Sequence, residues 1–279
     1  MPTLYIVGTP IGNLEDVTFR SLRVLREVSV VAAEDTRRAM VLFSRHGIST
    51  PLVSYHEQGS RTKLAPLLEK LREHDVALIT DAGMPGISDP GYALVTAALK
   101  QGARVEVVPG PSAVTAALAV SGLPPDQFVF LGFLPRTPGE RRRLLESVSR
   151  ERRTLVVFEA PHRLRASLGD IAKVLGERRL AVCRELTKLH EEVFRGTASE
   201  ALAHFESPRG EITLVIAGAT ETPQAEIVAE ASDDEVRRRL RSLTRDGSSG
   251  RDAVDAVVAE TGRARREVYR LWVGMNRQV

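Results

Sequence analysis

The chain contains little cysteine and few aromatic side chains, and each scarcity excludes a class of protein. A single cysteine, Cys183, excludes a disulfide within the chain and a cysteine-based metal site. Only 5% of the residues are Phe, Trp or Tyr, which argues against a sheet that stacks bases as single-strand-binding proteins do. No apolar run reaches the roughly 18 residues of a membrane span, and residues 1–8 predict a strand instead of a signal peptide. We therefore expect a soluble, cytoplasmic protein that has no membrane partner.

Several common cofactor motifs are missing as well. No two of the 21 glycines are separated by one residue, so the G-x-G of the Rossmann fingerprint and of the usual Rossmann methyltransferase loop is absent. The sequence also lacks the P-loop of ATPases and the G-x-S-x-G elbow of α/β-hydrolases. Its six histidines show no close metal-ligand spacing, so we expect no bound metal.

The hydrophobic pattern predicts an α/β fold. The 279 residues, 43% of them hydrophobic, suffice for about two domains with cores of their own. Short apolar runs alternate with helical stretches. Strands are expected at residues 4–7, 28–33, 76–80, 104–108, 128–132, 154–158, 180–183 and 212–217. Helices are expected at residues 35–46, from Pro90 to Gly102, from Pro111 to Gly122, and at 161–175, because a glycine follows each.

Two boundaries divide the chain into an N-terminal α/β domain at 1–120, a second α/β domain at 121–222 and a helical module at 223–279. The first lies at residues 122–126, where two prolines interrupt any helix, and the second follows the last strand signal. Three short helices are expected at 233–245, 250–260 and 264–275, and the turn at 261–263 has the spacing of a helix-turn-helix. Because the module's charges nearly cancel, it is either a dimerisation or packing module or an auxiliary contact to RNA.

Arginine supplies most of the positive charge. Of the 39 basic residues, 34 are arginine, the side chain whose planar fork suits phosphates and stacked bases. Two clusters stand out, at residues 136–153 and 237–241. They are either contacts to nucleic acid or ordinary solvated helix faces.

Three expected strands run into loops rich in glycine and proline. These loops cover residues 8–13, 81–91 and 109–112, and the second holds three glycines and two prolines. Such loops let a ligand approach the backbone closely. Ligands of open α/β sheets bind at the carboxyl ends of the strands. The three loops together predict a binding cleft.

Eight motifs in these loops and strand ends carry a family resemblance. They are residues 8–18 (GTPIGNLEDVT), 33–37 (AEDTR), 55–57 (YHE), 81–91 (DAGMPGISDPG), 109–114 (PGPSAV), 132–135 (GFLP), 159–163 (EAPHR) and 184–188 (RELTK). In this order they resemble the ribosomal RNA small subunit methyltransferase I family, a branch of the tetrapyrrole methylase superfamily. The resemblance covers about residues 3–218, and the tail is similar to that family's helix-turn-helix extension.

The resemblance implies a fold, a reaction and a cofactor. It implies a two-domain tetrapyrrole-methylase-like α/β fold, with the cofactor in the cleft between the domains, and a helix-turn-helix-like C-terminal module. The implied reaction is the S-adenosyl-L-methionine-dependent 2′-O-methylation of a cytidine ribose in 16S rRNA at the decoding centre. The implied partners are 16S rRNA within the small ribosomal subunit and a second copy of the chain in a homodimer. By the same resemblance, the residues expected to bind the cofactor are Pro10, Gly83, Met84, Pro85, Ile87, Ser88, Ser112, Ala113, Phe158, Ala160 and Thr213.

The chain departs from the family pattern at two places. Met84 stands where the superfamily motif G-D-P-x-x-x-x-x-G has an aspartate, so another residue must do what that acid does. Residues 58–60 (QGS) follow the YHE motif, whereas the family is expected to have more His or Asn residues at these positions.

A ribose hydroxyl is a poor nucleophile, so its methylation calls for alignment and for a proton acceptor. Glu159 follows a strand directly and is either this acceptor, a group that holds the cofactor, or a capping carboxylate. Lys188 is a base only if its pKa is lowered, and otherwise a phosphate contact. His162 is either a proton shuttle or a structural histidine.

Four residues in the motifs are expected to bind the RNA: Arg37, His56, Arg163 and Arg184. The alternative for the three arginines is internal salt bridges to Asp35, Glu159 and Glu185. Two other functions stay open, namely a small-molecule methylase of the tetrapyrrole type and a non-catalytic regulator that binds nucleic acid. The first would not need the arginine clusters, and the second leaves the three loops without a purpose.

Overall fold

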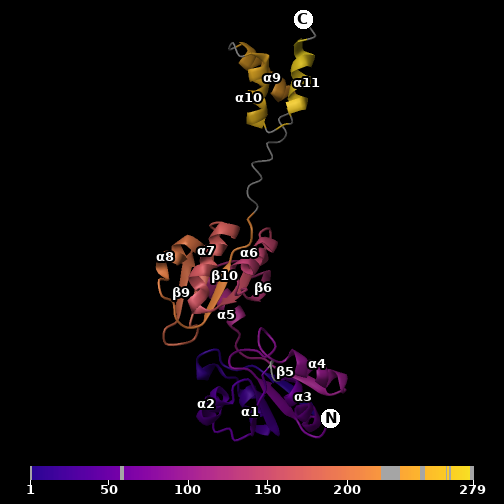
Figure 1. Cartoon of the computed structure of the whole chain (residues 1–279), viewed down its shortest axis with the longest axis vertical. Helices are drawn as coiled ribbons and strands as arrows, with labels where there is room; N and C mark the ends of the chain where they lie inside the picture. Colours follow the sequence, from indigo (N-terminus) through magenta and orange to yellow (C-terminus); the bar gives the residue numbers. More distant parts are fainter. Residues whose placement is uncertain are drawn as a thin grey trace. The chain divides into compact units, whose positions relative to one another are not determined.

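The computed structural model describes residues 2–56, 60–220, 233–245, 249–261, 263 and 265–276. The chain divides into two compact units, Met1–Ala219 and Thr220–Val279, which are described separately below. The first unit contains two five-stranded sheets. Figure 1 shows its strands and helices, coloured from indigo to orange along the chain. The α/β fold expected from the sequence is confirmed, whereas the two domain boundaries stay a prediction.

The first sheet is entirely parallel. Its strands are ordered β3-β2-β4-β1-β5. Their bounds are Thr3–Val7 (β1), Val30–Ala33 (β2), Leu52–Ser54 (β3), Val76–Ile79 (β4) and Arg104–Val108 (β5). Every residue of β2 and β4 is buried, as a parallel sheet with both faces covered requires. The chain runs outward from β1 to β3, returns to β4 and then passes to the opposite edge at β5. The carboxyl ends of β1, β4 and β5 are therefore neighbours.

Helices cover both faces of this sheet. They are α1 (Phe19–Glu27), α2 (Thr36–His46), α3 (Ser60–Lys70) and α4 (Tyr92–Lys100), with a short 3-10 turn η1 at Leu14–Asp16. Val31 of β2 joins the cluster that contains Leu25 and Phe43 of α1 and α2. The preceding residue, Val30, joins the cluster that contains Leu94 of α4. Successive residues of a strand point to opposite faces, so these two clusters lie on the two sides of the sheet.

The second sheet is mixed, and its strands are ordered β6-β7-β10-β8-β9. The pair β6 and β7 is parallel and the other pairs are antiparallel. The strand bounds are Phe128–Phe133 (β6), Thr154–Glu159 (β7), Leu180–Arg184 (β8), Glu192–Gly196 (β9) and Ile212–Ile216 (β10). The helices that follow in this half are α6 (Pro138–Ser147), η3 (Pro161–Arg163), α7 (Leu164–Leu175) and α8 (Ala198–His204).

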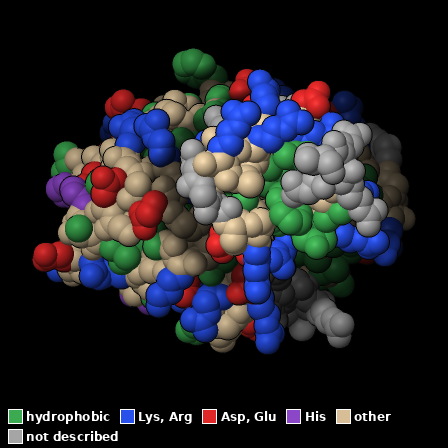
Figure 2. Space-filling model, turned by 90° about the horizontal axis from the view of Figure 1, so that it is seen from above, with side chains coloured by type: hydrophobic (Ala, Val, Ile, Leu, Met, Phe, Trp, Pro, Cys, Tyr) green, Lys and Arg blue, Asp and Glu red, His purple; other side chains and the backbone are tan. Residues whose placement is uncertain are grey.

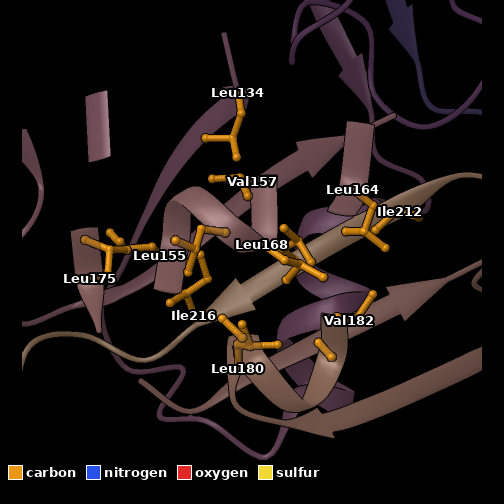
Figure 3. Packing of buried hydrophobic residues seen from close by; sticks show 14 of the residues in the cluster. Leu134, Leu155, Val157, Leu164, Leu168, Leu175, Leu180, Val182, Ile212 and Ile216 are labelled. Carbon is orange, nitrogen blue, oxygen red and sulfur yellow. The ribbon is translucent and has the colours of Figure 1, made fainter. Parts of the chain in front are cut away.

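Different helices pack on the two faces of the second sheet. Figure 3 shows Leu164 and Leu168 of α7 packed among strand residues such as Val157, in a core cluster that α6 and α8 also join. On the opposite face, α5 (Ala113–Ser121) contacts β8 and β10. Because α5 follows β5 directly, it connects the carboxyl edge of the first sheet with the second sheet.

The second unit contains three described helices, α9 (Asp233–Arg245), α10 (Gly250–Thr261) and α11 (Arg265–Asn276). Each contacts the other two around a small core that includes Leu240, Val254 and Val268. The three helices expected from the sequence are confirmed within one residue at either end. Over the residues described in both units, no helix is long and apolar enough to cross a membrane.

Candidate functional site

The loops that follow β1, β4 and β5 meet at one edge of the first sheet. Thr9 and Gly83 exchange two backbone hydrogen bonds, of 3.0 and 3.1 Å. The amide of Gly8 donates to the carbonyl of Val108 at 2.9 Å. A Cβ atom on Gly110 would lie 2.9 Å from the backbone of Gly8, so the first and third loops approach as closely as glycine allows. The predicted juxtaposition of the three loops is confirmed.

These loops and the facing end of the second sheet enclose a cavity of about 350 Å³. That volume lies within the range of about 300–1,000 Å³ that is typical of small-molecule sites. The second sheet contributes the ends of β6, β7, β8 and β10 to the wall. The structure brings together nine of the predicted residues here: Gly83, Met84, Ile87, Ser112, Ala113, Phe158, Glu159, Ala160 and Thr213.

Part of the cavity wall is aromatic. The ring of Phe158 meets the rings of Phe130 and Phe133 edge to face, with centroids 5.0 and 5.4 Å apart. The pairing of β6 with β7 shifts register between Phe130 and Phe133, and Gly132 has a φ of 68° there. Such a bulge re-aims the next side chain. Phe133 therefore lines the cavity while its side chain stays 55% exposed, which leaves an open aromatic surface for a flat ring.

The first turn of α5 supplies hydrogen-bond donors to the same cavity. Ser112 is the residue before the helix, and its side chain does not cap it. Ser112, Ala113 and Val114 all line the cavity. The first amides of a helix have no partner within it and carry partial positive charge. This end of α5 therefore suits an anionic or accepting group of a ligand.

Asp89 is an acidic residue of the cavity that the sequence analysis did not single out. It lies in the loop after β4, next to Ser88, whose φ of 63° is rare for a residue other than glycine. Burial and the charges of Glu34, Asp81 and Glu211 raise the pKa of its carboxyl to about 7. Among the described residues, none donates a hydrogen bond to this carboxyl or forms an ion pair with it. Its place in the glycine- and proline-rich loop after β4 was the one signal in the sequence that pointed to it.

Cys183 also lines the cavity, from the end of β8. Burial raises the pKa of its thiol to about 11, with smaller and opposing effects from Arg195 and Glu191. The thiol is therefore protonated at neutral pH and contributes an apolar surface in place of a nucleophile.

Glu159 lies at the cavity wall with its side chain fully buried, and both of its oxygens are already bound. Oε1 accepts from the amide of Ala160 at 2.7 Å and pairs with Arg163 at 2.6 Å. Oε2 accepts a hydrogen bond from the hydroxyl of Ser167. This pattern is typical of a carboxylate that holds the start of η3 and α7. A role for Glu159 as proton acceptor stays a prediction.

Lys188 lines a second cavity of about 260 Å³, together with Pro10, Arg38 and Asp81. The two cavities are adjacent, since Ile11, Ala82 and Glu211 line both. Burial by itself would lower the pKa of Lys188, but hydrogen bonds from its ammonium to Glu185 and Glu211, at 2.8 and 3.0 Å, raise it overall. The lysine is therefore a cation at neutral pH.

The remaining predicted residues lie outside the two cavities. Pro85 is buried, Ser88 and His56 are exposed, and the ring of His56 bonds to the hydroxyl of Ser54 at 2.8 Å. His162 is exposed on η3. Residues 58 and 59, in the departure from the family pattern, lie outside the described residues.

The three arginines expected to bind RNA each have a carboxylate partner. Arg37 pairs with Asp35 at 2.7 Å and remains 89% exposed. Arg163 pairs with buried Glu159, which is the internal salt bridge weighed as the alternative. Arg184 pairs with Glu192 at 2.8 Å in place of the expected Glu185. Of the three, Arg37 presents the most open guanidinium, and the RNA-binding roles stay predictions.

The arginine cluster at 136–153 is not a uniform solvated face. Arg141 is buried and pairs with Asp170 of α7 at 2.6 Å, so it joins α6 to α7. Arg142 shares the same aspartate at 3.6 Å, and Arg153 pairs with Glu151 at 2.7 Å. Part of this cluster therefore stabilises the second half of the unit.

Known proteins resemble this chain over most of its length. Residues 3–202 match the family of tetrapyrrole (corrin/porphyrin) methylases. The ribosomal RNA small subunit methyltransferase I of Thermotoga maritima is 53% identical over 221 residues, which are 78% of this chain and 99% of that protein. The protein of the same name from Synechocystis sp. is 45% identical over 275 residues and covers 97% of both chains.

Solved structures show the same fold. A uroporphyrin-III-C-methyltransferase from Thermus thermophilus has a TM-score of 0.56 at 25% identity, covering 78% of this chain and 94% of its own. A cobalt precorrin-4 methyltransferase has a TM-score of 0.60 at 20% identity, covering 77% and 94%. These neighbours support the two-sheet architecture of the first unit.

Proposed function

Because this chain belongs to the ribosomal RNA small subunit methyltransferase I family of the tetrapyrrole methylases, we propose that it methylates small-subunit ribosomal RNA. In finer terms, the proposed reaction transfers the methyl group of S-adenosyl-L-methionine to the 2′-hydroxyl of a cytidine ribose in 16S rRNA. The proposed setting is the small ribosomal subunit in the cytoplasm, with the enzyme as a homodimer. The observation that carries the proposal is the cavity at the junction of the three loops.

The cavity fits the cofactor in size and in chemistry. S-adenosyl-L-methionine combines a flat purine with polar groups, and when bound it supplies an activated methyl group. The exposed ring of Phe133 offers a surface for the purine, and Ser112 with the first amides of α5 offers donors for the polar part. The other predicted contacts are Gly83 and Met84 in the loop after β4. The same lining would also suit the predicted contacts from Ile87, Ala113, Phe158, Ala160 and Thr213.

We propose Asp89 as the acceptor of the hydroxyl proton. Its carboxyl lines the cavity, and no described residue forms a hydrogen bond or an ion pair with it. The carboxylate of Glu159, by contrast, already has such partners. A base is most effective when its pKa lies near the working pH, and burial places this acid there. In the proposed step the O–H bond breaks and the proton passes to Asp89. S-adenosyl-L-methionine, held by the loop after β4 and the start of α5, would supply the methyl group to the hydroxyl oxygen, and its sulfur would keep the electrons of the carbon–sulfur bond.

The second cavity offers a place for the RNA backbone. Arg38 and Lys188 line it, and both are cations close to the cofactor cavity. Each is already engaged with a carboxylate, Arg38 with Asp81 at 3.3 Å and Lys188 with Glu185 and Glu211. A phosphate would exchange for one of these carboxylates. Contacts of this kind position an RNA without reading its sequence.

The proposal is tested by parallel methyl-transfer assays with labelled S-adenosyl-L-methionine. The acceptors are 30S particles, naked 16S rRNA and a tetrapyrrole precursor. We expect label on ribose in one of the RNA samples, located by nuclease digestion and mass spectrometry. Label on the tetrapyrrole alone would replace the proposal with the small-molecule methylase. Cofactor binding without label on any acceptor would overturn the RNA assignment.

A further inference from the structure

The second unit contains a groove that the methyl-transfer site does not use. Its volume is about 600 Å³, and it lies between α10 and α11. The residues that line it are unusual in their chemistry, since three are arginines and two are large aromatic residues. They are Gly250, Arg251, Val254, Arg265, Arg266, Tyr269 and Trp272.

The aromatic residues form an ordered surface in this groove. The rings of Tyr269 and Trp272 are stacked, with centroids 6.0 Å apart and an angle of 26° between their planes. Trp272 packs against the first residue of α10, where a Cβ on Gly250 would lie 2.1 Å from the indole ring. Tyr269 is 56% exposed. One face of an aromatic pair is therefore held in place and open to a further ring.

The charges of the second unit are unevenly paired. Most of its described acidic residues already have a basic partner, as Asp255 has in Arg265 at 2.7 Å, Glu260 in Arg239 at 2.9 Å and Asp233 in Arg263 at 2.8 Å. Arg251 and Arg266 are exposed, and no described residue forms an ion pair with either. Although the basic and acidic residues of this unit are nearly equal in number, two arginines without an ion-pair partner therefore remain at the groove. Figure 2 shows basic side chains in blue beside hydrophobic ones in green on the face seen from above.

We propose that the groove between α10 and α11 binds a single-stranded segment of RNA. A base stacks on Tyr269, and the adjoining phosphates pair with Arg251 and Arg266. Single-stranded nucleic acids are held by this combination of an aromatic platform with a basic groove. That the ligand is RNA rests on the proposed function. The stacked rings and the unpaired arginines of the groove are observed independently of that function. An acidic peptide would satisfy the arginines but would leave the open face of Tyr269 without a partner.

The single tryptophan of the chain makes this proposal directly measurable. Trp272 lines the groove, so its fluorescence reports on this site and on no other. We expect an unlabelled, single-stranded RNA 12-mer to change the Trp272 emission of the full chain, and the change should saturate as the RNA concentration rises. The cofactor alone should not produce this saturating change. A fluorescein-labelled copy of the same RNA gives the dissociation constant independently, by anisotropy.

Charge reversal on two faces of the unit provides the variants and their control. The double variant Arg251→Glu, Arg266→Glu should weaken RNA binding at least tenfold and reduce the salt slope by about 1.4, the effect of two phosphate contacts. Tyr269→Ala should weaken binding about tenfold, and Tyr269→Phe should retain it. The control Arg245→Glu, Arg270→Glu changes the net charge equally at two exposed residues outside the groove, and should stay within threefold of wild type. Circular dichroism checks that each variant is helical.

The outcomes separate this proposal from the proposed function. Equal losses in the groove variant and in the control outside the groove would show a simple effect of net charge and overturn the groove assignment. RNA binding without a change in Trp272 emission, tighter binding of a poly-glutamate peptide, or no binding of the 12-mer would also overturn it. In each of these cases methyl transfer to 30S particles by the wild type would leave the proposed function standing. Loss of that transfer, with the groove still binding RNA, would remove the proposed function instead.

Discussion

The carboxyl group of Asp89 differs from the other acidic groups around the cavity. Glu159 has both oxygens bound, and Glu211 pairs with Lys188 at 3.0 Å. Asp89 has no such partner among the described residues, and its burial, together with the charges of three other carboxyl groups, raises its pKa. An unpaired, half-buried acid is costly to the folded state. Such an arrangement is typical of sites where a group must gain and lose a proton.

Replacing Asp89 by asparagine should lower the rate of methyl transfer by about 10²–10⁴-fold, the usual effect of removing a positioned base. The affinity for S-adenosyl-L-methionine, measured by calorimetry, should change by less than threefold. In the wild type the rate should rise with pH through about 7, because the base must be ionised. The variant should lack this rise. Asp126→Asn, at an exposed aspartate in the turn before β6, is the matched control.

The same substitution should stabilise the protein at alkaline pH. An unfolded aspartate titrates near about 3.9. The folded pKa of Asp89 is higher, about 7, so the folded state binds more protons between these values. Stability from this group therefore falls as pH rises from about 4 to 7. Asp89→Asn should melt at a higher temperature than wild type at pH 8, and the difference should shrink towards pH 4. A lower melting temperature at pH 8, or full activity with an unchanged pH profile, would contradict the assignment.

Single residues of the site differ in how far the sequence predicts them. Gly83 and Ser112 lie in loops that follow β4 and β5, and the topology of a parallel sheet brings those loops together at the cavity. Thr213 lies at the start of the antiparallel strand β10, and only the family resemblance placed it there. Asp89 was missed, because the pKa of an acid depends on how deeply it is buried and on carboxylates distant in sequence, such as Glu211. The partner of Arg184 was missed for a similar reason, since Glu192 lies on the neighbouring strand β9.

At the scale of elements, the site depends on how closely two loops approach each other. The loops after β1 and β5 cross with backbone against backbone at Gly8 and Gly110. Any side chain at this crossing would separate them. The crossing also sets the start of α5, whose first residues line the cavity and whose length packs on the second sheet. A small displacement here therefore changes both the ligand cavity and the contact between the two halves of the first unit.

Gly110→Ala tests the importance of this crossing. Its Cβ would lie 2.9 Å from the backbone of Gly8, closer than real contacts allow, so the loops must shift. We expect a loss of about 1–3 kcal/mol in the free energy of unfolding, as for other overpacked sites. Affinity for S-adenosyl-L-methionine should fall at least tenfold by calorimetry. Gly139→Ala in α6, where a Cβ meets nothing within 4 Å, is the control. It should leave the affinity unchanged and raise the free energy of unfolding by up to about 1 kcal/mol, as alanine does where glycine has no special role. Wild-type affinity in Gly110→Ala would show that the crossing does not shape the cavity.

Three of the elements that the sequence did not predict have weak local signals. Strand β3 has three residues at the edge of its sheet, too few to show alternation. Strand β9 is also an edge strand and includes Glu192 and Arg195, charges that natural edges use against aggregation. Helix α3 contains Pro66, which reads as a helix breaker. By contrast, the buried runs of β2 and β4 and the glycine that ends α2 were predicted, because these signals are local.

At the scale of the whole molecule, each unit has a core of its own. Among the residues that the structure describes, the first unit has four clusters of buried hydrophobic residues, and the second has one, which includes Val257 and Leu240. The Thermotoga maritima relative matches 78% of this chain with 99% of its own length. The fifth of the chain left unmatched corresponds in length to the second unit. The separate cores and this match in length favour a first unit that folds on its own.

A chain ending at Ala219 should therefore keep the cofactor site and lose the RNA groove. We expect one cooperative unfolding transition and an affinity for S-adenosyl-L-methionine within threefold of the full chain, because every residue that lines the cofactor cavity lies in the first unit. Its affinity for the single-stranded RNA 12-mer should fall about as far as in the Arg251→Glu, Arg266→Glu variant, because both changes remove the same contacts. The two measurements, calorimetry and anisotropy, need the same preparations. If the shortened chain binds the cofactor tenfold more weakly, the second unit supports the catalytic cavity. If it binds RNA as tightly as the full chain, the RNA contacts lie in the first unit alone.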